Sequence, residues 1–367
     1  MKRSISFLLV LVVLLNLFAV TPVYAKDSKA SKNSFYVVTE EVPQGVYDHI
    51  ANSLAGMIGD LYDVSTLTVS KPFKLYNAAS ELYYSIICSN GIPVGMYRSY
   101  QIEGRYTGIF SENAEMASKL LKLAPYTSSE RPATVIVGDY QDIYVLIEND
   151  VYQIDEDPFG NVTSSDRIRT LAVRYENVQV INISQNVDLV IKRLLRLPPN
   201  SSHYLEIGFD EIQGDQPWCL AYCTASIIRY KTGYSVGTVN AQAVMKWAFP
   251  NITYENLLRT SLSTDKAAEF AQRYNLHPRY VEYTRPYSQV KNEIALNSPI
   301  LFVCTNLSTN SKHGIVCRGY DDNSGQPYYS YWNPWNPYYE RIFADVPMFL
   351  GSNGCVYKWT AAMYGWK

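Results

Sequence analysis

One segment constrains the fold more than any other: a polar loop that leads directly into a buried helix, over residues 213–233. The loop ends at Pro217, which suits the first turn of a helix, where no backbone amide donor is needed. Leucine, alanine and isoleucine residues follow at positions that predict a mostly buried helix, and Gly233 suits its exit. We therefore expect Cys219 in the first turn of a core helix.

A cysteine at this position invites two interpretations. Inert packing is the commoner role for a cysteine in an apolar helix, and we assign that role to Cys223, one turn further along. Cys219 differs because the unpaired amides of a helix N-terminus stabilise a thiolate and lower its pKa, as does a neighbouring imidazolium. The position predicts a reactive thiol.

A thiol nucleophile needs a base, and histidine is scarce enough here to identify one by elimination. The chain has four histidines. His49 lies in the N-terminal half, His203 in a segment expected to be a linker, and His277 in an Asn-Leu-His-Pro turn. His313 follows a polar loop and opens an apolar strand, which makes it the candidate general base.

A third polar residue is expected beside His313. Residues 313–333 are predicted to form two strands around a turn at Asp321 to Gln326, with His313 opening the first strand and Asn333 ending the second. The amide oxygen of Asn333 can then accept the second ring N–H of the imidazole, and Trp335 can shield that hydrogen bond from water. Nucleophile, base and orienting group together form a generalised catalytic triad.

Four motifs in this half resemble the papain-like cysteine peptidases, and specifically the staphopain family of secreted bacterial peptidases. They are the Trp218-Cys219 pair, the His313-Gly314 strand, the Trp-Asn-Pro-Trp segment ending at Trp335, and the closing Tyr-Gly-Trp at 364–366. The Cys-Gly-Ser-Cys-Trp signature of papain is absent, so the likeness rests on the staphopain-like motifs.

The resemblance implies a role for each matched residue. Cys219 attacks the scissile carbonyl, His313 exchanges protons with the thiol and the leaving amine, and Asn333 holds His313. Gln213 matches the glutamine whose side-chain amide helps to form the oxyanion hole. Trp218 and Trp335 have supporting roles.

The resemblance also implies a layout for the whole chain. It places an α+β propeptide domain at 26–200 and a papain-like domain, with a helical half and an antiparallel β half, at 201–367. The propeptide acts as the inhibitor, and an activating protease cuts within the stretch from Lys192 to Ser202, where a short amphipathic helix, predicted by its own pattern, ends at two prolines. Protein or peptide substrates are expected, with no metal or organic cofactor.

The N-terminus predicts export. Lys2 and Arg3 precede an apolar run and a Val-Tyr-Ala cleavage pattern, so residues 1–25 are predicted to be a signal peptide. The run is shorter than the roughly 20 residues that a membrane span needs, so we expect no stable membrane anchor. In an exported chain, Cys88, Cys223, Cys304, Cys317 and Cys355 can pair or stay reduced, and the sequence does not decide between these states.

The N-terminal half shows both helical and alternating patterns. One amphipathic helix is expected between about residues 33 and 63, a strand at 73–76, a hairpin at 82–97 with an Asn90-Gly91 turn, a helix at 112–123 and strands at 134–137 and 143–148. The tyrosines of this half are expected on its surface.

Composition excludes one class of partner. A net charge of -2 and a pI near 6.1 provide no basic surface for nucleic acid. No cluster of histidines and cysteines has convincing metal-site spacing, because Cys219 and Cys223 supply at most two ligands.

Two other functions stay open. A cysteine with a histidine and a third polar residue also serves acyltransferases and murein amidases, although Asn333 followed by Trp335 favours a peptidase. A non-catalytic secreted binding protein, with the tyrosine-rich N-terminal half as its working part, predicts indifference to Cys219→Ala.

Overall fold

The chain is described by a computed structural model that covers residues 34–140, 142–156, 162–172, 175, 177–184, 202–322, 326–346, 348–351 and 354–367. The predicted signal peptide at 1–25 lies outside the described residues. So does the predicted amphipathic helix before Pro198. No helix in the described part is long and apolar enough to cross a bilayer.

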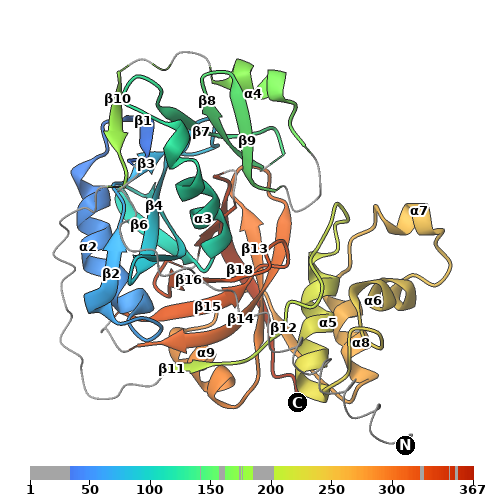
Figure 1. The fold of residues 1–367 in the computed structure, drawn as a ribbon. Coiled ribbons are helices and arrows are strands. Elements are labelled where there is room, and N and C mark those ends of the chain that lie inside the picture. Colours follow the sequence, from blue (N-terminus) through green and yellow to red (C-terminus); the bar gives the residue numbers. More distant parts are fainter. Residues whose placement is uncertain are drawn as a thin grey trace, which may run out of the picture. The chain divides into compact units, whose positions relative to one another are not determined.

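Helices and strands are mixed along the chain, and the α+β class is confirmed (Figure 1). The α-helices are α2 (Gln44–Ile58), α3 (Ala114–Lys122), α4 (Ser165–Leu171), α5 (Cys219–Thr232), α6 (Ala241–Ala248), α7 (Tyr254–Leu257), α8 (Thr264–Gln272) and α9 (Tyr287–Ala295). Two short 3₁₀ helices are η1 (Val64–Thr66) and η2 (Ala124–Tyr126).

The strands form two sheets. One has the order β10-β1-β7-β8-β9, from β1 (Tyr36–Glu40), β7 (Ala133–Val137), β8 (Ile143–Ile147), β9 (Asp150–Asp155) and β10 (Val178–Asn182). The other has the order β12-β18-β13-β14-β15-β16-β6-β5-β4-β2, with β3, β11 and β17 attached to it. Its strands are β2 (Leu67–Val69), β3 (Phe73–Lys74), β4 (Leu82–Ser89), β5 (Ile92–Ile102), β6 (Arg105–Ser111), β11 (Ser202–Tyr204), β12 (Arg279–Val281), β13 (Ile300–Asn306), β14 (Lys312–Asp321), β15 (Tyr328–Trp332), β16 (Tyr339–Phe343), β17 (Met348–Leu350) and β18 (Val356–Tyr364).

Helix α5 forms for the reasons its sequence suggests. Nine of its residues are buried, and it packs against α6, α8 and strand β14. Gly233 ends it in the left-handed conformation, with φ of 75°, which costs a residue without Cβ little. Cys219 is the first helical residue, as expected. Pro217 lies directly before the capping residue Trp218, outside the helix. The prediction that Pro217 lies in the first turn is therefore wrong, although only narrowly.

The expected elements of the N-terminal half are mostly present. The hairpin is confirmed as β4 and β5, with Asn90 and Gly91 both at positive φ. The long helix predicted from about 33 to 63 is shorter: α2 covers Gln44–Ile58, because the preceding residues form β1 instead. That strand pairs with β10 and β7, and this pairing satisfies backbone groups that a longer helix would otherwise have used.

The expected tyrosine-rich surface is wrong. Tyr83, Tyr84, Tyr97 and Tyr100 on β4 and β5 are each at most 2% exposed. Both faces of this hairpin are covered, by α2 on one side and α3 on the other, so its large side chains are part of the core. The N-terminal half therefore offers little tyrosine surface for a separate binding function.

The larger sheet runs without interruption from the C-terminal half into the N-terminal half. Strand β16 pairs with β6 in the register Glu340↔Ser111, Arg341↔Phe110 and Ile342↔Ile109. We call this β16–β6 pairing the seam between the two halves. Two buried ionic contacts support it. Arg98 on β5 pairs with Glu340, and Arg341 donates to Asp60 Oδ1 at 2.7 Å.

Removal of Arg98 tests the seam. The side chains of Arg98 and Glu340 are 6% and 1% exposed, so Arg98→Ala leaves a buried carboxylate without its cation. We expect a loss of about 3–5 kcal/mol in the free energy of unfolding, measured by urea denaturation.

The exposed pair Arg131–Glu148 supplies the matched control. Its side chains are 48% and 55% exposed, so Arg131→Ala should cost less than about 1 kcal/mol. The double variant Arg98→Met, Glu340→Leu should recover much of the loss. Equal losses for Arg98→Ala and Arg131→Ala would contradict the role of this ion pair.

Candidate active site

The structure brings His313 and Asn333 into contact. His313 is the second residue of β14, and Asn333 directly follows β15, its antiparallel neighbour. The imidazole Nε2 lies 2.9 Å from Asn333 Oδ1. Trp335 stacks on the imidazole, with ring centroids 3.6 Å apart and an interplanar angle of 19°. Both members of the hydrogen bond are at most 3% exposed.

A second contact establishes which ring nitrogen carries the proton. The backbone N–H of Trp335 donates to the same Oδ1 atom at 3.2 Å, which identifies this atom as the amide oxygen. An oxygen can only accept, so His313 Nε2 is the donor. In the neutral imidazole, Nδ1 then has a free lone pair.

Gly314 connects this pair to Cys219. A Cβ built on Gly314 would lie 3.6 Å from the backbone N and Cα of Leu220 and 3.7 Å from the carbonyl carbon of Cys219. Strand β14 therefore contacts the first turn of α5 at the residue after His313. The amides of Gly314, Leu220 and Cys219 itself interact with the thiol and act to lower its pKa.

Burial outweighs those amides. It raises the pKa of the Cys219 thiol above its ordinary value, so the expectation of a lowered pKa is wrong for this state of the protein. Burial likewise lowers the pKa of His313 to about 4, against the opposing effect of the Asn333 hydrogen bond. Since both shifts favour the uncharged forms, the structure describes a neutral thiol and a neutral imidazole.

Gln213 lies on a loop tied to the same place. Its backbone N–H donates to the carbonyl of Pro334, one residue after Asn333, at 2.8 Å. Its side-chain Nε2 donates to the carbonyl of Gln216 at 2.7 Å, so in this structure the amide is engaged within its own loop. Trp218 is buried and donates from its ring nitrogen to the carbonyl of Leu257 at 3.0 Å.

The other histidines have structural contacts. His49 Nε2 lies 2.9 Å from the hydroxyl of Tyr97, and His203 Nε2 lies 3.2 Å from Asn297 Oδ1. His277 is exposed, and its backbone N–H bonds to the C-terminal residue. Among the described residues, which include all six cysteines, no disulfide forms, and no group of three or more His, Cys, Asp or Glu side chains is placed to hold a metal ion.

Sequence reasoning missed two side chains that contact His313. Phe349 on β17 and Tyr357 on β18 have ring centroids 5.7 and 6.0 Å from that of the imidazole. The sequence pattern does not predict the hairpin of β17 and β18, and an aromatic residue in a strand is ordinarily assigned to the core. Only the pairing of β18 with β13, which itself pairs with β14, places these rings at the site.

A helical half packed against an antiparallel β half, with Cys219 opening the central helix, is the architecture of papain-like cysteine peptidases. Residues 203–366 match the model of the family described as staphopain peptidase C47. This match covers less than half of the chain and supports a staphopain-like domain over these residues.

Curated relatives agree with the family match. Staphopain A of Staphylococcus aureus (strain MRSA252) is 26% identical over 161 residues, which is 42% of this chain and 41% of the relative. An extracellular cysteine protease of Staphylococcus epidermidis is 24% identical over 161 residues, 42% of this chain and 91% of the relative. The matched part of this chain thus spans about two fifths of the full length of staphopain A.

The low pKa of His313 predicts a pH dependence of stability. The unfolded-state pKa is about 6.5 and the folded value is about 4, so the unfolded chain binds the proton first as the pH falls. The stabilising contribution is complete above pH 6.5 and is lost as the pH falls toward 4.

The test compares two proteins: the single variant Cys219→Ala, and the double variant that carries both Cys219→Ala and His313→Gln. The free energy of unfolding of each is measured by urea denaturation at pH 7.5 and at pH 5. The protein that retains His313 should lose about 2 kcal/mol more of its free energy of unfolding over this interval. His49, whose pKa burial also lowers to about 4, is present in both proteins and cancels in the comparison. An equal loss in the two proteins would show that the pKa of His313 is not lowered.

Proposed function

We propose that this chain is a secreted cysteine endopeptidase that is made as a zymogen. Cys219 is the nucleophile, His313 the general base, Asn333 the group that orients His313, and Gln213 an oxyanion donor. The observation that carries the proposal is the imidazole of His313, bonded at Nε2 to Asn333 and covered by Trp335, beside the first turn of the helix that Cys219 opens. Membership of residues 203–366 in a family of cysteine peptidases supports it.

The tautomer of His313 supports its role as base. With Nε2 donating to Asn333, Nδ1 is the nitrogen available to take the thiol proton. The Cys219 sulfur attacks the scissile carbonyl carbon as its proton passes to Nδ1. The imidazolium then gives that proton to the leaving amine, and a thioester remains. Water, deprotonated by His313, cleaves the thioester and restores the thiol.

The neutral starting state shapes this sequence of steps. A raised thiol pKa and a lowered imidazole pKa make a preformed ion pair unfavourable in the buried precursor site. Proton transfer therefore accompanies attack on the carbonyl. The amides at the first turn of α5 act on the sulfur and are placed to stabilise negative charge that develops there.

Gln213 needs one rearrangement for its role. Its Nε2 donates to Gln216 in the precursor, and its Oε1 is buried without a hydrogen-bond partner among the described residues. A rotation of the side chain that releases Gln216 turns Nε2 toward the oxyanion. The backbone bond from Gln213 to Pro334 keeps the loop against the Asn333 turn during this change.

Activity and thiol chemistry test the nucleophile together. Cys219→Ala should abolish casein hydrolysis and covalent labelling by an epoxide inhibitor of papain-like peptidases. Cys223→Ala is the matched control, because Cys223 lies on the same helix but is fully buried and burial raises its thiol pKa well above the ordinary value. It should retain both properties.

Labelling at Cys219 without proteolysis by any form of the protein would favour an acyltransferase or a murein amidase instead. Unchanged casein hydrolysis by Cys219→Ala would exclude Cys219 as the nucleophile.

The zymogen part of the proposal rests on the seam. Strands β2 to β6 extend the sheet that contains β14 and β16, and Arg98 and Asp60 form ion pairs with residues of β16, which supports a precursor in which both parts fold together. We propose 26–200 as the propeptide, with cleavage between Lys192 and Ser202. Export follows from the predicted signal peptide at 1–25, and a relative described as an extracellular cysteine protease supports it.

A site for a sequence-specific protease, inserted between Lys192 and Ser202, tests the zymogen. Cutting should raise activity on casein by at least about tenfold, because it frees the N-terminal segment to separate from the C-terminal part that carries Cys219 and His313. The same cut in a Cys219→Ala chain should produce no activity, which controls for the added protease. Full activity from the uncut chain would rule out a zymogen.

A further inference from the structure

Three aromatic rings surround the imidazole of His313. Trp335 stacks on it, while Phe349 and Tyr357 approach at tilts of 44° and 57°. Tyr357 touches both other rings: it stacks on Phe349 at 4.9 Å and 14°, and meets Trp335 edge-on at 6.2 Å and 68°. Tyr357 thus joins the two sides of the aromatic cluster.

Two strands hold Tyr357 in place. In the sheet it lies opposite Asn306 on β13 and opposite Phe349 on β17. Its hydroxyl interacts with the side chains of Asn306 and Ser311, and these interactions lower its pKa against the larger, raising effect of burial. The phenol therefore has polar partners as well as ring contacts.

Those polar partners belong to the turn that leads into His313. Asn306 Oδ1 accepts the backbone N–H groups of Ser308 and Thr309 at 2.8 and 3.0 Å, and the N–H of Asn306 donates to the carbonyl of Ser311 at 2.8 Å. His313 follows two residues after Ser311. The hydroxyl of Tyr357 is therefore connected to the start of β14.

Tyr357 also lies within electrostatic range of Cys219. The charge of a Cys219 thiolate raises the pKa of the Tyr357 phenol, which places the two groups within electrostatic range of one another. Titratable groups near the imidazole in the described part of the chain include Cys219 on α5, Tyr357 on β18 and Cys304 on β13, which is paired in register with His313. Asn333 faces the imidazole from the turn after β15.

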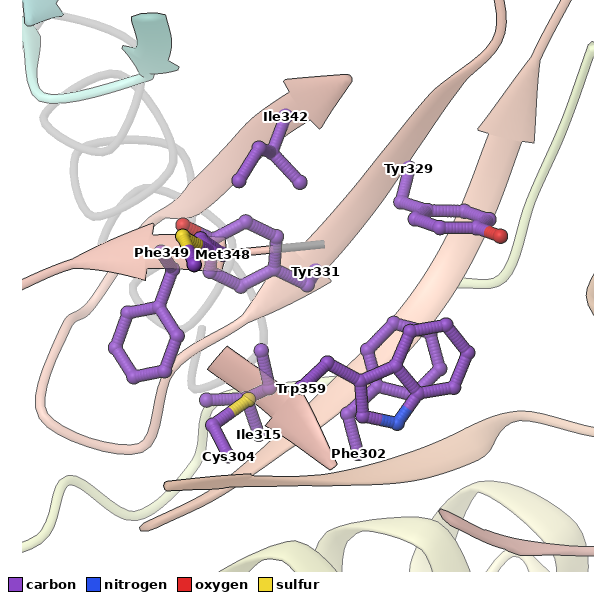
Figure 2. A pocket seen from close by; sticks show the side chains of 9 residues that line it. All are labelled: Phe302, Cys304, Ile315, Tyr329, Tyr331, Ile342, Met348, Phe349 and Trp359. Carbon is purple, nitrogen blue, oxygen red and sulfur yellow. The ribbon is translucent and has the colours of Figure 1, made fainter. Parts of the chain in front are cut away.

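Phe349 also lines an apolar pocket. Figure 2 shows it, with Met348, on one side of an apolar pocket whose other side is formed by Phe302 and Trp359. The cavity volume of this pocket is about 10 Å³, so the side chains that line it are closely packed. Phe349 therefore packs closely against the pocket residues and also stacks on Tyr357, which connects the pocket to the rings around His313.

We propose that Tyr357 is a positioning residue for the reaction assigned to Cys219 and His313. Its ring completes the cover that keeps water from the imidazole, and its hydroxyl fixes the turn from which His313 projects. The kinetic consequences of this proposal rest on the proposed function. Its consequence for the pKa of His313 can be measured in a protein without activity.

The first experiment follows the histidines by NMR in the Cys219→Ala protein. Four histidines give few signals, and loss of one signal in the His313→Gln variant assigns that residue. Tyr357→Leu should raise the pKa of His313 from about 4 toward the ordinary 6.5, because water then reaches the ring. Tyr357→Phe keeps the ring and should leave this pKa unchanged.

The second experiment measures kinetics in the activated enzyme. Tyr357→Leu should lower kcat about tenfold with KM within about twofold, and shift the acid limb of kcat/KM upward by about one pH unit. Tyr357→Phe should lower kcat about threefold without shifting the acid limb of the kcat/KM profile, because this variant loses only the interaction of the hydroxyl with the turn before His313. Tyr364→Phe, on the same strand but beside Arg285, is the control and should change neither quantity.

The outcomes separate the two proposals. If no form of the protein shows peptidase activity, the proposed function fails, and the His313 titration still decides the role of Tyr357. A wild-type titration in Tyr357→Leu overturns the positioning role. If Tyr357→Leu does not fold, the Tyr357→Phe enzyme decides instead. A kcat equal to that of Tyr364→Phe then overturns the positioning role of Tyr357.

Discussion

The hydrogen bond from His313 to Asn333 is the interaction on which the candidate site depends. His313 lies at the start of β14, and Asn333 directly follows the neighbouring strand β15. The antiparallel pairing of the two strands brings these residues together. Because Asn333 Oδ1 also accepts the amide of Trp335, one oxygen fixes both the tautomer of the imidazole and the position of the ring that covers it. A buried, doubly used acceptor of this kind leaves the imidazole few alternative orientations.

Strand β14 extends the influence of this bond across the molecule. It packs on α5 at Gly314, pairs with β13 and β15, and so belongs to the sheet that continues through β16 into β6. In a catalytic domain without residues 34–184, β16 would be the edge of that sheet. Glu340 and Arg341 are charged residues on this strand, and charge on an edge strand opposes unwanted pairing once the edge is exposed. Charged residues that form ion pairs here and could be solvated at an exposed edge fit the proposal that the N-terminal part separates after cleavage.

Local sequence predicted the parts of the site that depend on local chemistry. The helix that Cys219 opens, the hairpin that carries His313 and Asn333, and the Asn90-Gly91 turn each follow from periodicity and turn residues within about 20 positions. What failed depends on pairing between distant segments. The N-terminal end of the predicted long helix became β1 because β10 and β7 were available as partners, and tyrosines became core because α2 and α3 cover both faces of β4 and β5. Tyr357 was missed for the same reason, since its neighbours at the site come from β13 and β17.

The ionisation of Cys219 shows where a sequence argument about chemistry stops. The helix N-terminus does supply amides that favour a thiolate, yet burial has the larger effect and raises the thiol pKa. The proposed pairing with His313 would add a further effect. Two opposite unit charges about 4 Å apart attract by about 4 kcal/mol at an effective dielectric constant of 20, so a thiolate and an imidazolium stabilise one another and titrate as a pair. The balance between neutral and ionic pair then depends on how much water reaches the two groups, and the rings of Trp335, Phe349 and Tyr357 cover the imidazole side of the pair.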